Sequence, residues 1–300
     1  MVGAAIARAE ESHSRLNAVA VPLYDEAASA ARRLDRDGAR VLALAGVPVT
    51  VKESLDLAAT PSSGGVEALA AGRARRDGRI VAALRAAGAV PIAKGNVAQL
   101  LWFAETENPV YGRTANPHAL DRSPGGSSGG DAALVAAGVA PIAIGTDLGG
   151  SVRQPAHCCG IAALKPTAGR LSLEGSLDER LFAPFPWIEN QPGIFARDVA
   201  DLELVLSVLD AGAAPAQPPP ATATSPRGLR VGVIETNGIL APHPAVRRAV
   251  GQAAAAAERA GARVVPFTPP AADHALELFD AVFVSDGGKT IERMLAGTPR

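Results

Sequence analysis

Apolar and polar positions repeat along the first 210 residues with two periods, one typical of helices and one typical of strands. The helical period predicts helices in five segments, at 4–12, 24–37, 79–87, 131–137 and 198–209. Short apolar runs rich in valine and isoleucine predict strands at 41–51, 90–93 and 141–145. Residues 96–122 are rich in Asn, Pro and Gly, which indicates a long loop with a short helix. Strands that alternate with helices favour an α/β fold with a partly parallel sheet.

The last third of the chain begins with a change of composition. Residues 211–227 are rich in proline and alanine and are interpreted as a surface linker. After this linker the pattern predicts a strand at 229–234, a helix at 244–260 and a strand at 262–266. We expect this βαβ unit to join the sheet of the first part. The chain 1–300 is therefore interpreted as a single domain with a core at 40–210 and a C-terminal βαβ segment at 228–300.

The composition is that of a globular protein without a dominant charge. Of 300 residues, 48% are hydrophobic and 20% are charged, and the formal net charge is -1. This balance gives no bulk field that would attract nucleic acid or an anionic membrane, so neither partner is expected. No apolar run approaches the roughly 20 residues that cross a bilayer. The N-terminus also lacks the apolar stretch of a signal peptide, and a cytoplasmic location is predicted.

The cysteines and histidines give little support to a metal site or a disulfide. Cys158 and Cys159 are adjacent, and neighbouring cysteines rarely satisfy disulfide geometry. The chain has no CxxC pair, and its five histidines are scattered. Neither a metal nor another cofactor is expected, and both cysteines are interpreted as small packed residues.

Two serine sites bracketed by glycine lie in the segment 123–167. They are GGSSGG at 125–130 and GGS at 149–151. Glycine flanks serine this closely where the backbone must approach a ligand or adopt unusual dihedral angles. The first site satisfies G-x-S-x-G, but a loop precedes it instead of the strand of a nucleophile elbow, which argues against an α/β-hydrolase. Neither site carries a nucleotide-binding glycine motif.

Lysine is scarce in this chain and is found at particular places. Of 29 basic residues only four are lysine, and Lys52, Lys94 and Lys165 each follow an apolar, strand-like run. A desolvated lysine loses its proton whereas arginine keeps it, so lysine suits a position that needs a base. The alternative is that each of these lysines belongs to a structural ion pair.

The segment 123–167 resembles the amidase signature family. The resemblance rests on GGSSGG, TDLGGSVRQPA and CGIAALKPT, and it extends upstream to GVPVTVKE at 46–53 and NPVYGRT at 108–114. It implies the amidase-signature fold, an α/β fold whose central mixed sheet is covered by helices on both faces. Members of the family extend further than this chain, so the resemblance also implies truncation at both ends and an incomplete C-terminal segment.

The resemblance further implies roles for individual residues. Ser151 corresponds to the nucleophile, Ser127 to a bridging serine that follows a cis peptide bond, and Lys52 to the base. The oxyanion hole corresponds to the backbone amides of Leu148, Gly149, Gly150 and Ser151. The supporting residues are Ser128, Thr146, Asp147 and Arg153. Asp147 and Arg153 are expected to brace the oxyanion loop as an ion pair, the alternative being a surface pair that stabilises little.

Elementary chemistry agrees with these roles. A serine hydroxyl is a poor nucleophile until a base takes its proton. The hydroxyl of Ser127 can accept one hydrogen bond while it donates another, so it can pass a proton from Ser151 to Lys52. Lys52 must be neutral to receive this proton, and burial favours the neutral form of lysine.

The implied activity is hydrolysis of the C–N bond of a small carboxamide through an acyl-Ser151 intermediate. Two other interpretations stay open. One is a glutamine-hydrolysing amidotransferase subunit that passes ammonia to a partner protein, and the other is a truncated fragment without catalytic activity. Formation of a homodimer is also left open. Partner dependence of the activity separates the first two interpretations, and failure to label Ser151 in folded protein favours the third.

Overall fold

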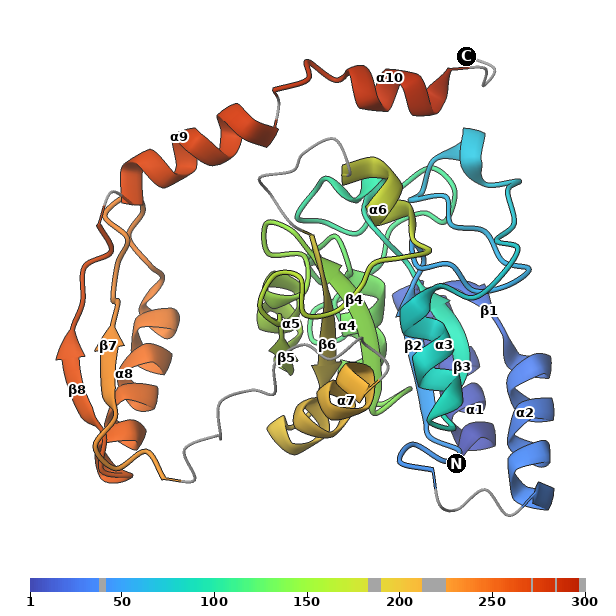
Figure 1. Cartoon of the computed structure of the whole chain (residues 1–300), viewed down its shortest axis with the longest axis horizontal. Coiled ribbons are helices and arrows are strands. Elements are labelled where there is room, and N and C mark those ends of the chain that lie inside the picture. The colour runs from blue at the N-terminus through green and yellow to red at the C-terminus, as the bar shows by residue number, and fades with distance from the viewer. Residues whose placement is uncertain (38–41, 183–189, 212–224, 271, 284, 297–300) are drawn as a thin grey trace. The chain divides into compact units, whose positions relative to one another are not determined.

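The computed structural model describes residues 1–37, 42–182, 190–211, 225–270, 272–283 and 285–296. The chain divides into two compact units, one of residues 1–216 with 290–300 and the other of residues 217–289. Every residue of the predicted site belongs to the larger unit (Figure 1).

A six-stranded sheet forms the centre of the larger unit. Its strands are β1 (Val19–Pro22), β2 (Pro48–Lys52), β3 (Val90–Gly95), β4 (Ile142–Asp147), β5 (Ala162–Leu164) and β6 (Gln191–Ala196). They lie in the order β1-β3-β2-β4-β6-β5. The central strands β3, β2 and β4 run parallel, whereas β1, β6 and β5 pair antiparallel with their neighbours. The predicted mixed sheet is confirmed.

Helices cover both faces of this sheet, as expected. They are α1 (Val2–Leu16), α2 (Tyr24–Asp37), α3 (Arg79–Ala86), α4 (Gly129–Ala136), α5 (Arg153–Cys159), α6 (Leu177–Phe182) and α7 (Val199–Ala211), with short 3₁₀ helices at Glu67–Leu69 and Gln99–Leu101. Side chains of β4 alternate between the two faces. Ile142 and Ile144 pack in a cluster with α3 and α7, whereas Ala143 packs in another cluster with α4 and α5.

The same alternation decides which face of β2 carries the predicted base. Val49 and Val51 belong to the apolar cluster with α3 and α7. Thr50 therefore faces the layer of α4, where its hydroxyl donates to Asp131 Oδ1 at 2.8 Å. Lys52 follows two residues later and ends the strand on this same face. The lysine is thus directed toward the glycine-rich segment from which α4 begins.

The smaller unit contains a two-stranded parallel sheet of β7 (Arg230–Val233) and β8 (Arg263–Pro266), joined through α8 (Pro244–Arg259). Two helices follow in the sequence, α9 (Ala272–Phe283) and α10 (Lys289–Leu295), and all of α10 after Lys289 is assigned to the larger unit. The βαβ unit was predicted correctly, but the expectation that it joins the main sheet is wrong, because β7 and β8 pair with each other. The single-domain interpretation stays a prediction, and most of the predicted linker, at 212–224, lies outside the described residues.

None of the helices in the described part of the chain is both long and apolar enough to cross a bilayer.

Candidate active site

Lys52 lies at the end of β2 and has 1% of its surface exposed. Its Nζ atom is 2.9 Å from Ser127 Oγ and 2.6 Å from Thr146 Oγ1. Burial lowers the pKa of Lys52 below its ordinary value of 10.5, and nearby carboxylates, Asp178 first among them, offset part of this shift. The expected base is therefore buried, has a lowered pKa and contacts the expected bridging serine.

Ser127 lies in the turn that leads into α4, and the Gly126–Ser127 peptide bond is cis, as the resemblance implied. Gly126 packs against the backbone of the preceding loop, where an added Cβ would lie 2.7 Å from Phe103 O. The backbone of the neighbouring Ser128 donates to Ser151 O at 3.2 Å. This last contact joins the two glycine-rich serine segments that were identified in the sequence.

Ser128 is buried and connects α4 to β4. Its hydroxyl donates to Thr146 O at 3.3 Å and accepts from Thr146 N at 3.4 Å. Gly145 makes this approach possible, because an added Cβ there would lie 2.7 Å from Ser128 Oγ. The position of Ser128 is that of a structural support for the turn holding Ser127.

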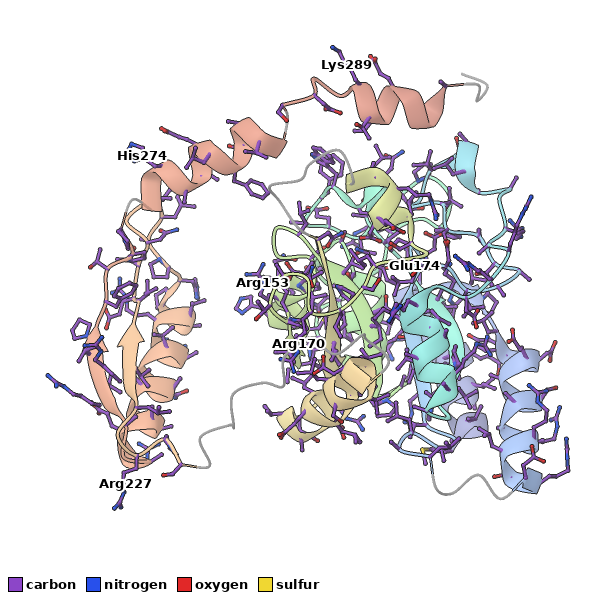
Figure 2. The ribbon with its side chains drawn as sticks, viewed as in Figure 1. Arg153, Arg170, Glu174, Arg227, His274 and Lys289 are labelled. Carbon is purple, nitrogen blue, oxygen red and sulfur yellow. The ribbon has the colours of Figure 1, made fainter. Side chains whose placement is uncertain are left out.

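Asp147 and Arg153 form the expected ion pair, with Arg153 Nη2 2.7 Å from Asp147 Oδ1. Arg153 is half exposed and is labelled in Figure 2, whereas Asp147 is buried. Burial raises the pKa of Asp147, but the guanidinium and the backbone N–H groups that it binds outweigh this effect and hold the pKa below its ordinary value. The pair therefore closes the loop between β4 and α5.

The predicted oxyanion loop, Leu148 to Ser151, lies between β4 and α5. Gly150 adopts φ +128°, a conformation that L side chains rarely adopt. Its N–H donates to Asp147 Oδ1 at 2.9 Å, so this amide is bound within the loop. The donors that stay candidates for a substrate oxygen are therefore the amides of Leu148, Gly149 and Ser151.

Asp178 was not identified in the sequence as a site residue. This buried carboxylate lies 3.8 Å from Lys52 Nζ and accepts a hydrogen bond from the hydroxyl of Thr146. It also accepts from the hydroxyl of Ser54 and, at 2.7 Å, from Asn190 Nδ2. The motif S-x-x-E at 176–179 predicts the start of a helix, but no local pattern indicates that Asp178 reaches Lys52.

Two other buried charged groups flank this cluster. Asp131 on α4 has a pKa raised by burial to about 7, and its Oδ2 atom has no hydrogen-bond partner among the described residues. Lys94 on β3 has a pKa lowered by burial to about 8 and contacts Pro61 O and, at 3.2 Å, Ser62 Oγ. Lys94 therefore binds the loop at Pro61 and Ser62, whereas Lys52 binds Ser127 and Thr146.

Glu53, the residue after Lys52, has partners of its own. Its carboxylate accepts from Ser63 N at 2.7 Å, from Gly64 N at 2.9 Å and from the hydroxyl of Tyr111 at 2.9 Å. These contacts anchor the loop that follows β2. Within the described residues, no group of three His, Cys, Asp or Glu side chains could hold a metal ion.

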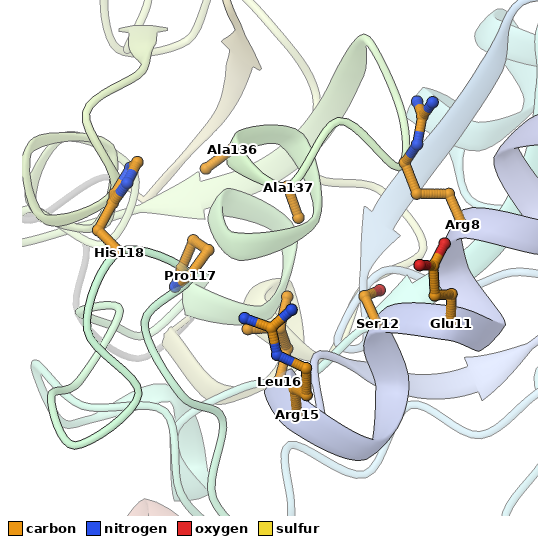
Figure 3. A pocket seen from close by; sticks show the side chains of 9 residues that line it. All are labelled: Arg8, Glu11, Ser12, Arg15, Leu16, Pro117, His118, Ala136 and Ala137. Atoms are coloured by element: carbon orange, nitrogen blue, oxygen red, sulfur yellow. The ribbon is translucent and has the colours of Figure 1, made fainter.

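A hollow of about 380 Å³ is lined by residues of α1, by Pro117 and His118, and by Ala136 and Ala137 at the end of α4 (Figure 3). Arg8, Arg15 and Glu11 from α1 line it together with His118. Arg8 donates to Gly138 O at 2.6 Å, and His118 Nε2 lies 2.8 Å from Cys159 O. Arg8 and His118 are therefore already bound by the protein itself.

Comparison with known proteins gives a consistent result. The sequence matches the amidase family over residues 1–298. It is 38% identical to fatty-acid amide hydrolase 1 from Sus scrofa over 263 residues, which cover 85% of this chain and 45% of the relative. It is 35% identical to a glutamyl-tRNA(Gln) amidotransferase subunit from Deinococcus radiodurans over 297 residues, covering 96% of this chain and 60% of the relative. The chain thus spans about half the length of the curated relatives it matches.

Solved structures with the same fold include a fatty acid amide hydrolase, with a TM-score of 0.89 and 28% identity over 97% of this chain and 53% of that chain. A structure of 6-aminohexanoate cyclic dimer hydrolase complexed with substrate gives a TM-score of 0.77 and 33% identity, over 90% of this chain and 57% of that chain. The mixed sheet with helices on both faces is therefore the architecture of these enzymes.

Proposed function

The chain belongs to the amidase family, and we propose that it hydrolyses the C–N bond of a carboxamide through an acyl intermediate on Ser151. In this proposal Lys52 is the base and Ser127 passes the proton between Ser151 and Lys52. Ser128, Asp147 and Arg153 support the two loops.

The observation that carries this proposal is the contact between Lys52 Nζ and Ser127 Oγ, at 2.9 Å in a site where both side chains have 1% of their surface exposed. A lysine that is exposed to water is protonated at neutral pH and has no lone pair to offer. Burial favours the neutral amine, which can accept the proton of a hydroxyl. The residue after Ser127, Ser128, donates its backbone N–H to Ser151 O, so the segment that carries Ser151 lies next to the turn of Ser127. A serine beside a neutral amine and near a second serine supports a Ser-Lys type of nucleophilic catalysis.

The proposed acylation moves two protons, with a net gain of one by Lys52, and exchanges the amide C–N bond for an ester C–O bond. The proton of Ser151 Oγ passes to Ser127 Oγ, while the proton of Ser127 passes to Lys52 Nζ. Ser151 Oγ attacks the amide carbon, and the C=O electron pair moves to the oxygen. When the C–N bond breaks, the nitrogen takes a proton back along the same path, and ammonia or an amine leaves. Water then hydrolyses the ester of Ser151 with the same groups acting as acid and base.

The negative oxygen of the tetrahedral intermediate requires donors that are already in place. We assign this role to the backbone amides of Leu148, Gly149 and Ser151, because the amide of Gly150 is bound to Asp147. A single donor of this kind contributes about 3 kcal/mol of transition-state stabilisation. Several donors on one short loop would therefore supply a large part of the rate enhancement.

A second candidate function follows from the similarity to a component of a glutamyl-tRNA(Gln) amidotransferase. In that case the carboxamide is glutamine, and the ammonia is passed to a partner protein. The chemistry at Ser151 is the same for both candidates. Release of ammonia from simple amides by the isolated chain supports the first candidate, whereas release that requires a partner supports the second.

A fluorophosphonate probe tests the assignment of the nucleophile. We expect mass spectrometry of the digested protein to place a single adduct on Ser151. The Ser151→Ala variant should not react, whereas Ser128→Ala should still react at Ser151 if it folds. An adduct on Ser128, or no adduct on folded wild-type protein, would contradict the proposal.

A further inference from the structure

Asp178 accepts a hydrogen bond from Thr146, and Thr146 in turn contacts Lys52. Asp178 lies 3.8 Å from Lys52 Nζ and is fully buried. It receives hydrogen bonds from the side chains of Thr146, Ser54 and Asn190. Asp178 is the acceptor in all three of these hydrogen bonds.

The chain holds Asp178 in this position by pairing two distant segments. Leu177 N donates to Ser54 O at 2.8 Å, two residues after the end of β2, and an isolated bridge joins Leu55 to Ser176. Ser176 Oγ also accepts from Glu179 N at 2.9 Å, which fixes the first turn of α6. The side chain of Asp178 therefore reaches the end of β2, where Lys52 lies.

The contact with Asp178 determines how Thr146 binds Lys52. A threonine hydroxyl has one hydrogen to donate, and in this site Thr146 donates it to Asp178. The 2.6 Å contact between Thr146 Oγ1 and Lys52 Nζ must then use an N–H of the lysine. A neutral amine that donates in this direction keeps its lone pair for another partner, and Ser127 Oγ lies at 2.9 Å.

Four carboxylates act on the charge of Lys52: Asp178, Asp131 on α4, Asp147 at the end of β4, and Glu53 just after β2. Asp178 has the largest effect of the four. Asp147 is already paired with Arg153, and Glu53 binds the loop at Ser63. Asp131 accepts from Thr50, whereas Asp178 lies 3.8 Å from Lys52 Nζ. Asp178 is therefore the carboxylate best placed to stabilise Lys52 when the lysine gains a proton.

We propose that Asp178 is a positioning residue of the amide-hydrolysing site: through Thr146 it directs the lone pair of Lys52 to Ser127, and it is the counter-charge when Lys52 holds the transferred proton. This inference rests on the proposed function of Lys52. It separates two tasks, since Ser127 moves the proton while Asp178 keeps the amine oriented and stabilises its charged form.

The scarcity of lysine allows a direct test by NMR. With only four lysines in the chain, ¹⁵N-labelled lysine gives few side-chain signals, and Lys→Arg variants assign them. Asp178→Asn removes the charge but keeps an oxygen that accepts from Thr146. We expect this variant to lower the titration midpoint of Lys52 by about 1 to 3 pH units, the usual effect of losing a close opposite charge.

Asp56→Asn is the matched control. Asp56 forms an ion pair with Arg180, which lies on α6 as Asp178 does. Asp56 raises the pKa of Lys94 but is not among the groups that act on the pKa of Lys52. We therefore expect Asp56→Asn to lower the midpoint of Lys94 and to leave that of Lys52 in place. Asp178→Asn should lower the midpoint of Lys52 and leave that of Lys94 in place. An unchanged or raised midpoint of Lys52 in Asp178→Asn overturns the inference.

A second pair of variants tests the orientation of Lys52 and does not depend on how well Asp178→Asn folds. Thr146→Val removes the hydroxyl at constant shape and should slow acylation of Ser151 by at least about tenfold, the equivalent of one pKa unit of interaction. Thr146→Ser keeps the hydroxyl and should restore the rate. Equal rates in the two variants would overturn the positioning role.

The outcome is distinguishable from failure of the proposed function. If wild-type Ser151 does not react with the probe, the proposed activity is wrong, whatever the lysine titrations show. If Ser151 reacts in a Lys52-dependent manner but Asp178→Asn leaves the Lys52 titration unmoved, only the role of Asp178 is wrong.

Discussion

Two opposing effects act on the pKa of Lys52. Burial removes the ammonium from water, which strongly disfavours the charged form. Carboxylates close by favour that form and recover part of the difference. The balance lowers the pKa of Lys52 without removing the ability of the amine to hold a proton, which is the property that a reversible base requires.

The first prediction at this scale concerns the base itself. Lys52→Met should fold, because it removes a buried amine while keeping most of the side-chain volume, but its Ser151 should not be acylated. Lys52→Arg should be inactive too, since the guanidinium keeps its proton. In the wild type the acylation rate should rise with pH through one ionisation below the ordinary lysine value of 10.5, because the ammonium has no lone pair below that ionisation.

Lys165→Met is the control for this experiment. Lys165 Nζ donates to Pro166 O and does not contact the residues around Ser127, so its loss should leave the rate and the pH profile unchanged. Rates of probe attachment measured across pH, with folding checked at each pH, give the comparison. If Lys52→Met kept the rising limb of the wild type, the ionisation would belong to another group.

Single residues also show where sequence reasoning ends. The scarcity of lysine and the family motifs led to Lys52 and Ser127. The contact between them agrees with their predicted roles as base and bridging serine, and these roles stay predictions. Asp178 could not be found in this way, because an acidic residue in the first turn of a helix is ordinary and usually faces water. Its burial depends on the bridge between Leu55 and Ser176, which joins residues more than a hundred positions apart.

Elements with a strong local period were predicted well. The helix predicted at 24–37 has the same bounds as α2, and the helix predicted at 79–87 ends one residue later than α3 does. The strand β6 was missed, because Pro192 and Gly193 make its sequence look like a loop. Gly193 is required there because an added Cβ would lie 2.8 Å from Val152 Cγ2. Tertiary packing thus overrides local propensity in β6.

A second packing constraint holds the turn of Ser127 against the sheet. Gly145 on β4 leaves room for Ser128, and an added Cβ would lie 2.7 Å from Ser128 Oγ and 2.8 Å from Phe195 Cε2. Gly145→Ala must therefore push the start of α4 away from β4. We expect a loss of about 1 to 3 kcal/mol in the free energy of unfolding, as for other overpacked sites. The rate of Ser151 acylation should fall by more than the stability change explains, because Ser127 moves away from Lys52.

Gly3→Ala is the matched control for this variant. An added Cβ at Gly3, on α1, meets nothing within 4 Å, so the substitution should leave acylation unchanged and stabilise the protein, by at most about 1 kcal/mol. Thermal unfolding and probe attachment measure the two effects separately. A Gly145→Ala variant that is destabilised but acylates at the wild-type rate would show that the turn of Ser127 tolerates displacement from β4.

The chain consists of two compact units, each with its own sheet. The sequence correctly predicted the strands and helix of the βαβ segment, because their periods are local. It did not reveal which sheet these strands join, since strand pairing depends on contacts between distant parts of the chain. Because β7 pairs with β8, the smaller unit has a sheet of its own.

This division leads to a prediction for the whole chain. Every hydrogen bond to Lys52, Ser127 or Asp178 comes, within the described residues, from the larger unit. A substitution that disrupts the smaller unit should therefore leave the site intact. Ala262→Asp places a charge at a buried position of that unit, between α8 and β8. We expect faster proteolysis within residues 217–289 but an unchanged rate of Ser151 acylation.

The counterpart in the larger unit is Ala132→Asp, which places the same charge on α4 in the cluster that contains Phe195. Burying an unpaired charge there should displace the helix that follows Ser127, so acylation should be lost together with stability. The two variants carry the same chemical change and differ only in the unit they affect. If Ala262→Asp also abolished acylation while the larger unit still resisted proteolysis, acylation would require an intact smaller unit and the chain would act as one domain, as the sequence alone predicted.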